Sequence, residues 1–155
     1  MGQITRQSFL GLISGVALLS VFAGFGAADA QTPPPGRRIA LSGYDPVAYF
    51  TLGRPEKGSD KFWFAFDDAI YYFDGADHRA MFAADPERYA PQYAGFCAAG
   101  LSKGVKHEPD PEAWAIVNGK LYVVELKERI EQFKKDPDSI INKANANWPR
   151  LRDAH

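Results

Sequence analysis

The sequence predicts an α+β fold: a small single domain of antiparallel β-hairpins with packed helices. Two runs rich in strand-forming residues, 62–66 and 69–73, flank the turn dipeptide Asp67-Asp68. A second pair of runs, 114–117 and 120–124, flanks Asn118-Gly119, which suits a type I′ turn. Helical patterns follow each hairpin. Because strands and helices do not alternate singly, the order argues against a parallel βαβ sheet.

The first half of the domain is expected to begin with a strand. Residues 47–51 are rich in strand formers and follow the turn signal Asp45-Pro46. After the first hairpin a helix is predicted through about Ala84, with Asp74 as a good N-cap residue. Pro86 then starts a short second helix that ends at Tyr89.

The second half is expected to be helical after its hairpin. Residues 91–102 form a compact segment whose type the pattern leaves open. From Leu126 the apolar residues share one helical face until Pro137 interrupts the pattern. Asp138 is predicted to cap a last helix that Trp148-Pro149 ends. No internal repeat is evident in the sequence.

The N-terminal residues 1–30 are typical of a cleavable secretory signal. A charge-free stretch from Phe9 to Ala28 ends in Ala28-Asp29-Ala30, a small-x-small cleavage pattern. Cleavage after Ala30 predicts a periplasmic or secreted protein, and an uncleaved N-terminal anchor is the alternative. Thr5-Arg6-Gln7 resembles a twin-arginine motif, but Gln7 replaces the second arginine, so unfolded export is expected. Residues 31–38 then form a Pro-rich tether, and residues 39–150 form the domain.

Composition excludes several classes of partner and activity. The formal net charge of −1 gives no electrostatic footprint for nucleic acid or for an anionic membrane surface. No stable membrane span is expected after cleavage. The chain has no nucleophile elbow, phosphate loop, zinc helix or CxxC pair, so nothing argues positively for catalysis. Its single cysteine, Cys97, is a buried thiol, an intermolecular bridge or a ligand.

The soft and borderline metal ligands of the chain are few. His78 and Met81 share one face of the predicted helix, with Asp74 one turn before His78. If Cys97 folds back onto this helix, the four side chains form a site that suits Cu(I), because thiolate and thioether are soft ligands. The alternatives are a core methionine, an exposed histidine, a capping aspartate and a buried thiol.

Several spaced motifs resemble the YHS domain. They are Gly43-Tyr44-Asp45-Pro46-Val47-Ala48-Tyr49-Phe50, Tyr71-Tyr72-Phe73, 82–89, 90–98, 110–114, 118–122 and 146–149. Together they cover nearly all of residues 41–149 and look like the stand-alone exported YHS proteins of bacteria. The metal-handling branch of that family carries cysteines where this chain has Ala48, Asp74 and His78. The resemblance therefore implies the YHS fold and an association with metals, with most of the soft-metal site replaced.

Three functions follow from these observations. The favoured one is an exported small binding protein that binds or handles metal, with copper the most plausible ion and Cys97, His78, Asp74 and Met81 as its ligands. The alternative is a module that binds a small molecule or a protein partner through an aromatic pocket formed by Tyr44, Tyr49, Tyr93 and Trp114. The third is a thiol-redox protein that uses Cys97, which requires a nearby cation or a helix N-terminus to lower the pKa of the thiol.

Overall fold

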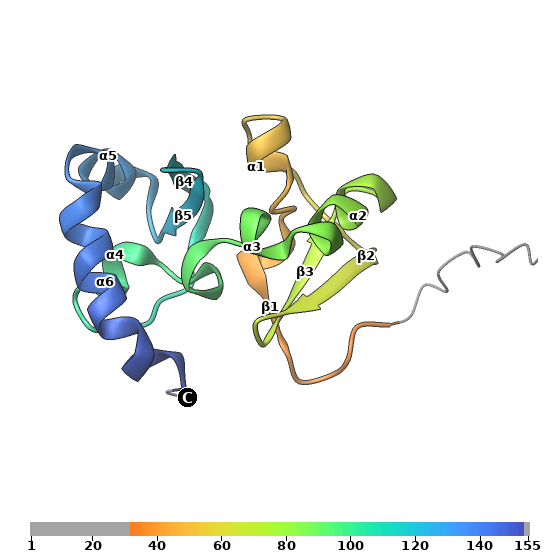
Figure 1. The fold of residues 1–155 in the computed structure, drawn as a ribbon, viewed down its shortest axis with the longest axis horizontal. Helices are drawn as coiled ribbons and strands as arrows, with labels where there is room; N and C mark the ends of the chain where they lie inside the picture. Colours follow the sequence, from red (N-terminus) through yellow and green to blue (C-terminus); the bar gives the residue numbers. More distant parts are fainter. Residues whose placement is uncertain (1–31, 154–155) are drawn as a thin grey trace, which may run out of the picture.

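The computed structural model describes residues 32–153 and confirms the α+β class (Figure 1). Both predicted hairpins are present, and each belongs to its own small sheet. The first sheet has the order β1-β3-β2 and contains β1 (Arg38–Ile39), β2 (Ser59–Phe66) and β3 (Ala69–Phe73). The second contains β4 (Asp110–Val117) and β5 (Lys120–Val124). The pair β1–β3 is parallel and joins Arg38, the last residue of the predicted tether, to Ala69.

Six α-helices and two 3-10 segments connect and cover the strands of the described residues. They are η1 (Ala40–Gly43), α1 (Ala48–Thr51), α2 (Ala76–Ala84), α3 (Pro86–Tyr89), η2 (Gln92–Gly95), α4 (Ala98–Ser102), α5 (Lys127–Lys135) and α6 (Pro137–Arg152). Figure 1 shows two lobes side by side: β1–β3 with α1 and α2, and β4–β5 with α4, α5 and α6. Among these residues no helix has the length and apolar character that crossing a membrane requires.

The predicted strand at 47–51 is wrong, because this segment forms the short helix α1. The carboxylate of Asp45 accepts a hydrogen bond from Val47 N at 2.8 Å, which turns the chain into a helical conformation. The apolar side chains that suggested a strand are buried: Val47 and Ala48 are fully inaccessible, and Tyr49 is 1% exposed. Burial in the core thus overrides the strand propensity of this segment.

Three helix ends also differ from the prediction. The N-cap of α2 is Gly75 without a side-chain hydrogen bond, so the carboxylate of Asp74 does not cap this helix. The last helix is capped by Asp136, which accepts from Ser139 N at 3.2 Å, and not by Asp138. It continues through Pro149 to Arg152.

The two lobes are units that share one arrangement of elements, a structural repeat that does not bear on the prediction of no repeat in the sequence. In the first hairpin Ser59 pairs with Phe73, and the register shifts before Trp63 pairs with Tyr72. In the second, Asp110 pairs with Val124, and the same shift precedes the pairing of Trp114 with Val123. Each hairpin leads into a helix that buries one phenylalanine completely, Phe82 in α2 and Phe133 in α5. Both helices end at an Asp-Pro pair whose aspartate caps the next helix.

The segments that precede the two hairpins match as well. In η1, Leu41, Ser42 and Gly43 have φ values of 53°, 50° and 80°. In η2, Tyr93, Ala94 and Gly95 have φ values of 59°, 51° and 80°. Two successive non-glycine residues in the left-handed region are uncommon, so the shared conformation is a specific feature. An aromatic residue and then a fully buried polar or thiol side chain follow each glycine: Asp45 in the first unit and Cys97 in the second.

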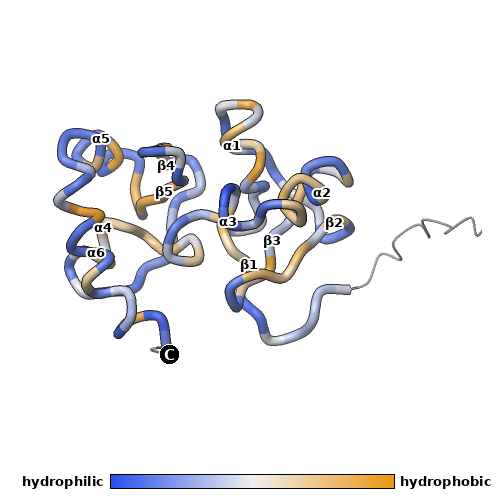
Figure 2. The backbone as a smooth tube through the Cα atoms, viewed as in Figure 1, coloured by the Kyte–Doolittle hydropathy of each residue, from blue (hydrophilic) through white to orange (hydrophobic). Residues whose placement is uncertain are grey.

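The buried apolar side chains form three clusters. One lies in the first unit and centres on Phe82, and a second lies among β5, α4, α5 and α6 of the second unit. The third joins the units, since it packs Leu41 and Tyr49 against Leu121 and Val123 of β5. In Figure 2 the chain of α5 and α6 is largely hydrophilic, with short apolar stretches.

Candidate functional site

A buried carboxylate that holds a histidine is the most organised polar group of the first unit. Asp45 is fully inaccessible, and its Oδ2 lies 2.6 Å from His78 Nδ1 on α2. The same carboxylate accepts hydrogen bonds from Val47 N at 2.8 Å and from Asp74 N at 2.9 Å. These contacts fix the carboxylate from three directions. The histidine ring therefore contacts a buried carboxylate that also accepts two backbone N–H groups.

The contact with Asp45 determines which ring nitrogen of His78 carries a proton. A carboxylate only accepts hydrogen bonds, so Nδ1 of His78 donates to it. In the neutral ring the lone pair is then on Nε2, which lies 3.4 Å from the hydroxyl of Thr51. Thr51 also lies 3.1 Å from the carbonyl of Val47, to which its hydroxyl donates. The side chain of His78 is 19% exposed, so its ring is open to solvent at the surface of the first unit.

Asp74 and Met81 lie in the same unit and have different surroundings. Asp74 is exposed, and its backbone N–H is the group that Asp45 holds. Met81 is half-buried and packs against the apolar cluster around Phe82. The backbone N–H of Asp74 and the ring of His78 thus both contact Asp45, while Met81 packs as a core side chain.

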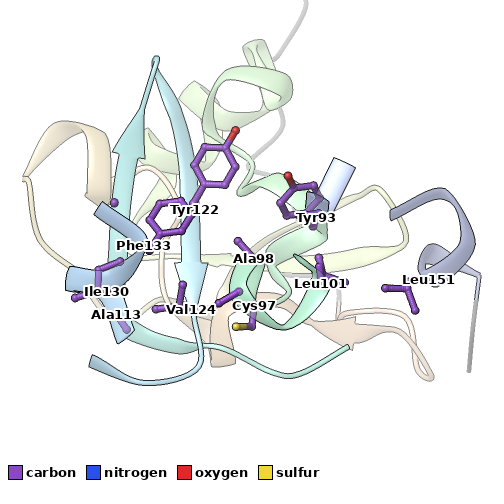
Figure 3. Close-up of a cluster of buried hydrophobic side chains, with 13 residues drawn as sticks. Tyr93, Cys97, Ala98, Leu101, Ala113, Tyr122, Val124, Ile130, Phe133 and Leu151 are labelled. Atoms are coloured by element: carbon purple, nitrogen blue, oxygen red, sulfur yellow. The ribbon is translucent and has the colours of Figure 1, made fainter. Parts of the chain in front are cut away.

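Cys97 is buried in the core of the second unit. Figure 3 shows it among Ala98, Leu101 and Val124, which belong to the same cluster. Its side chain is fully inaccessible, and its Sγ accepts hydrogen bonds from Gly100 N and from Glu125 N, each at 3.2 Å. Burial raises the pKa of the Cys97 thiol and outweighs the backbone hydrogen bonds that favour the thiolate. A reactive thiol requires the opposite shift, so this environment gives the thiol-redox hypothesis no support.

The expected copper(I) ligands do not come together. Cys97 lies in the core of the second unit, whereas His78 and Met81 belong to α2 of the first. Within residues 32–153, no group of three or more histidine, cysteine, aspartate or glutamate side chains is placed to hold a metal ion. The combined set Cys97, His78, Asp74 and Met81 therefore does not fit a shared soft ion.

The four aromatic residues expected to line a pocket are divided between the clusters. Tyr49 is 1% exposed, donates to the carbonyl of Pro111 at 2.8 Å and packs edge-on against Trp114 at 5.2 Å between ring centroids. Tyr44 and Trp114 pack around this same cluster and are half-buried. Tyr93 belongs to the core of the second unit.

The hydroxyl groups of these tyrosines are also engaged. Tyr93 donates to Asn145 Oδ1 at 2.8 Å, and Tyr49 donates to a backbone carbonyl. Burial raises the pKa of both phenols. Both side chains thus serve packing and hydrogen bonding within the fold. Trp114 also lines an open groove of about 600 Å³.

Asp45 and Thr51 are the residues of this site that the sequence does not single out. Asp45 precedes a proline and so resembles an ordinary turn residue. Its partner His78 lies much farther along the chain, so no local spacing connects them. One sequence pattern could have identified Asp45. An aspartate followed two residues later by an apolar helical segment is the arrangement of an Asx turn.

Comparisons with known proteins identify no relative. No family model, no curated protein sequence and no solved structure matches the chain. The resemblance to the YHS domain stays a prediction from the quoted motifs.

Proposed function

We propose that this protein is an exported metal-handling protein and that His78 is its principal metal-binding side chain. The observation that carries the proposal is the 2.6 Å contact between His78 Nδ1 and the buried Asp45. Histidines that ligate metals almost always donate their other ring N–H to a carboxylate or a carbonyl, which fixes the tautomer and orients the ring. The buried position of Asp45 makes this support rigid.

The donor atoms near His78 favour a borderline divalent ion. They are the imidazole nitrogen of His78 and the hydroxyl of Thr51, which lies 3.4 Å from it. Nitrogen and oxygen donors suit Cu(II) and Zn(II), whereas Cu(I) prefers thiolate and thioether ligands. The proposal thus keeps copper as a candidate ion, in its divalent state, and removes Cys97 and Met81 from the ligand set.

A site with so few protein ligands binds weakly and exchanges its ion readily. Structural zinc sites use four protein ligands, and catalytic sites generally use three. Here water or groups supplied by a partner molecule complete the coordination. This arrangement suits the transfer of an ion better than its storage. The signal predicted for residues 1–30, which lies outside the described residues, supports the proposal of a periplasmic or secreted location.

Titration calorimetry of the purified protein with Cu(II) and with Zn(II) tests this proposal. We expect one ion to bind in a step that the variant His78→Asn abolishes. Asparagine keeps an N–H that can reach Asp45 but removes Nε2, so the substitution separates metal binding from support of the fold. Cys97→Ser and Met81→Leu are expected to leave this step unchanged.

The matched control is His107→Asn, which removes an exposed imidazole of the second unit. This variant is expected to bind as the wild-type protein does. Wild-type affinity in His78→Asn would overturn the proposal, as would an equal loss of binding in His78→Asn and His107→Asn.

A further inference from the structure

A small cavity of about 210 Å³ lies among the helices of the second unit. It is formed where α4, α5 and α6 meet, and Figure 1 shows these three helices beside one another in the left-hand lobe. Three cationic side chains line it: Lys103, Arg129 and Lys143. Among the described residues no carboxylate contributes to its wall. The cavity is therefore a cationic site that the proposed metal binding at His78 does not use.

The packing of the helices brings these cations to the same cavity. Arg129 is on α5, Lys143 is on α6, and Lys103 directly follows α4. Lys143 lies one helical turn before Asn147, whose amide donates to the carbonyl of Leu101 at 2.9 Å. Because residues four apart share a helix face, Lys143 lies on the face of α6 that contacts α4. The contact between the two helices thus fixes the backbones that carry Lys103 and Lys143.

The charges of the two lysines are not compensated within the described part of the chain. No ion pair and no hydrogen bond of these residues involves the ammonium group of Lys103 or of Lys143. Both side chains are exposed, so an anion displaces only water from them. Two like charges at one small cavity raise its electrostatic potential. This arrangement favours an anion with two negative charges over one with a single charge.

Arg129 adds hydrogen-bond donors to the cavity rather than net charge. Its Nη1 pairs with Oε1 of Glu125, a half-buried carboxylate. This ion pair holds the guanidinium in place. A guanidinium has five N–H donors in one plane, so pairing through Nη1 leaves further donors for a ligand. Such a planar set of donors matches the oxygens of phosphate, which is why arginine is frequent at phosphate sites.

One part of the wall is apolar. Ala99 and Phe133 belong to the core cluster of the second unit, and Ile140 packs against it. The volume of about 210 Å³ is below the roughly 300–1,000 Å³ of pockets for drug-sized ligands, so the occupant is small. A ligand that fits both parts of the cavity has a doubly charged head, alone or with a short apolar group.

We propose that this cavity binds a phosphate group, carried by a small monoester or present as inorganic phosphate. The phosphate oxygens contact Lys103, Lys143 and Arg129, and the organic group of a monoester packs against Ile140. A phosphate monoester loses its second proton with a pKa of about 6, so it carries close to two negative charges above about pH 7. The site is independent of metal binding at His78, and loss of either function leaves the other intact.

Titration calorimetry of the purified full chain with ethyl phosphate tests the proposal, at about pH 8 and about 0.1 M salt, where a Debye length of ~10 Å screens distant charges. We expect saturable 1:1 binding. Ethanesulfonate has the same ethyl group and a tetrahedral head with a single negative charge, and its binding is expected to be at least tenfold weaker, which corresponds to about 1.4 kcal/mol. Titration with inorganic phosphate distinguishes the two sources of the phosphate group: tighter binding of ethyl phosphate identifies a monoester, and equal or tighter binding of inorganic phosphate identifies the free ion.

Variants of single lysines separate this site from general electrostatic attraction. Lys103→Gln and Lys143→Gln are each expected to weaken the binding of ethyl phosphate about tenfold. Lys135→Gln is the matched control, because Lys135 is an exposed cation of α5 that does not line the cavity. This control and His78→Asn are expected to bind ethyl phosphate as the wild-type protein does. Wild-type affinity in both Lys103→Gln and Lys143→Gln would overturn the proposal, as would an equal loss in Lys135→Gln or equal binding of ethyl phosphate and ethanesulfonate.

Discussion

Replacement of Asp45 by alanine removes the acceptor of three hydrogen bonds at once. Val47 N, Asp74 N and His78 Nδ1 lie 2.8, 2.9 and 2.6 Å from its carboxylate oxygens, and the residue is fully buried. Hydrogen bonds to charged groups contribute about 1.5–3 kcal/mol each, offset here by the cost of burying the charge. Because Asp45→Ala leaves backbone donors buried without an acceptor, we expect a loss of about 3–5 kcal/mol in the free energy of unfolding.

Urea unfolding followed by circular dichroism measures this loss. At roughly 4 °C per kcal/mol for a domain of this size, the midpoint of thermal unfolding should fall by about 12–20 °C. The control is Asp85→Ala, since Asp85 is an exposed aspartate that caps α3 through one bond to Arg88 N at 3.2 Å. Loss of such a cap costs about 1 kcal/mol. If the two variants lose equal stability, the central role assigned to the buried carboxylate is incorrect.

Two further predictions concern Cys97 and alkaline pH. Cys97 is inaccessible, and burial raises the pKa of its thiol. Iodoacetamide should therefore label Cys97 ~100-fold more slowly in the folded protein than in urea. Similar labelling rates would show that the thiol is open to solvent. Burial also raises the pKa of Tyr49, Tyr71 and Tyr93 above the ordinary value of 10.0, as it does that of Cys97 above 9.0. As the pH rises, the unfolded chain loses these protons before the folded chain does. The free energy of unfolding is therefore constant below about pH 8.5 and falls above pH 9, by up to about 1.4 kcal/mol per pH unit for each group. In urea titrations at stepped pH, Cys97→Ser should move the onset toward pH 10, and constant stability up to pH 10.5 would contradict the assignment.

The hairpins were predictable because their signals are local. Asp67, Asp68 and Asn118 have φ values of 47°, 61° and 51°, and Gly119 has 73°. These are the left-handed conformations that the turn dipeptides indicate. Helices α2 and α5 were predictable for the same reason, since helical spacing and Asp-Pro punctuation can be recognised within a short window.

The candidate site was only partly predictable, because its contacts are not local. His78 and Asp74 could be found from their spacing on a helix. The ring nitrogen of His78 is instead fixed by Asp45, which the chain brings close through η1 and the first hairpin. Cys97 was recognised as a candidate ligand, but whether a thiol is buried depends on how β5 and α4 pack around it.

The structural repeat explains why Asp45 and Cys97 have such different consequences. Each follows a left-handed turn, and each donates its own backbone N–H to a loop carbonyl: Asp45 to Glu56 at 2.9 Å and Cys97 to His107 at 3.0 Å. Each side chain then accepts the N–H of the residue after its hairpin, Asp74 or Glu125.

The fold thus requires a buried acceptor at this position, and the identity of the acceptor decides what else the unit can do. A carboxylate accepts several hydrogen bonds and can hold a histidine as well as the hairpin end. A thiol is a weak acceptor, and Cys97 serves only backbone groups. At the place on α5 that corresponds to His78 on α2, the second unit has Arg129, which pairs with the carboxylate of Glu125. The same scaffold therefore presents an oriented imidazole in the first unit and a closed, apolar core in the second, which is why the proposed metal site is assigned to the first unit.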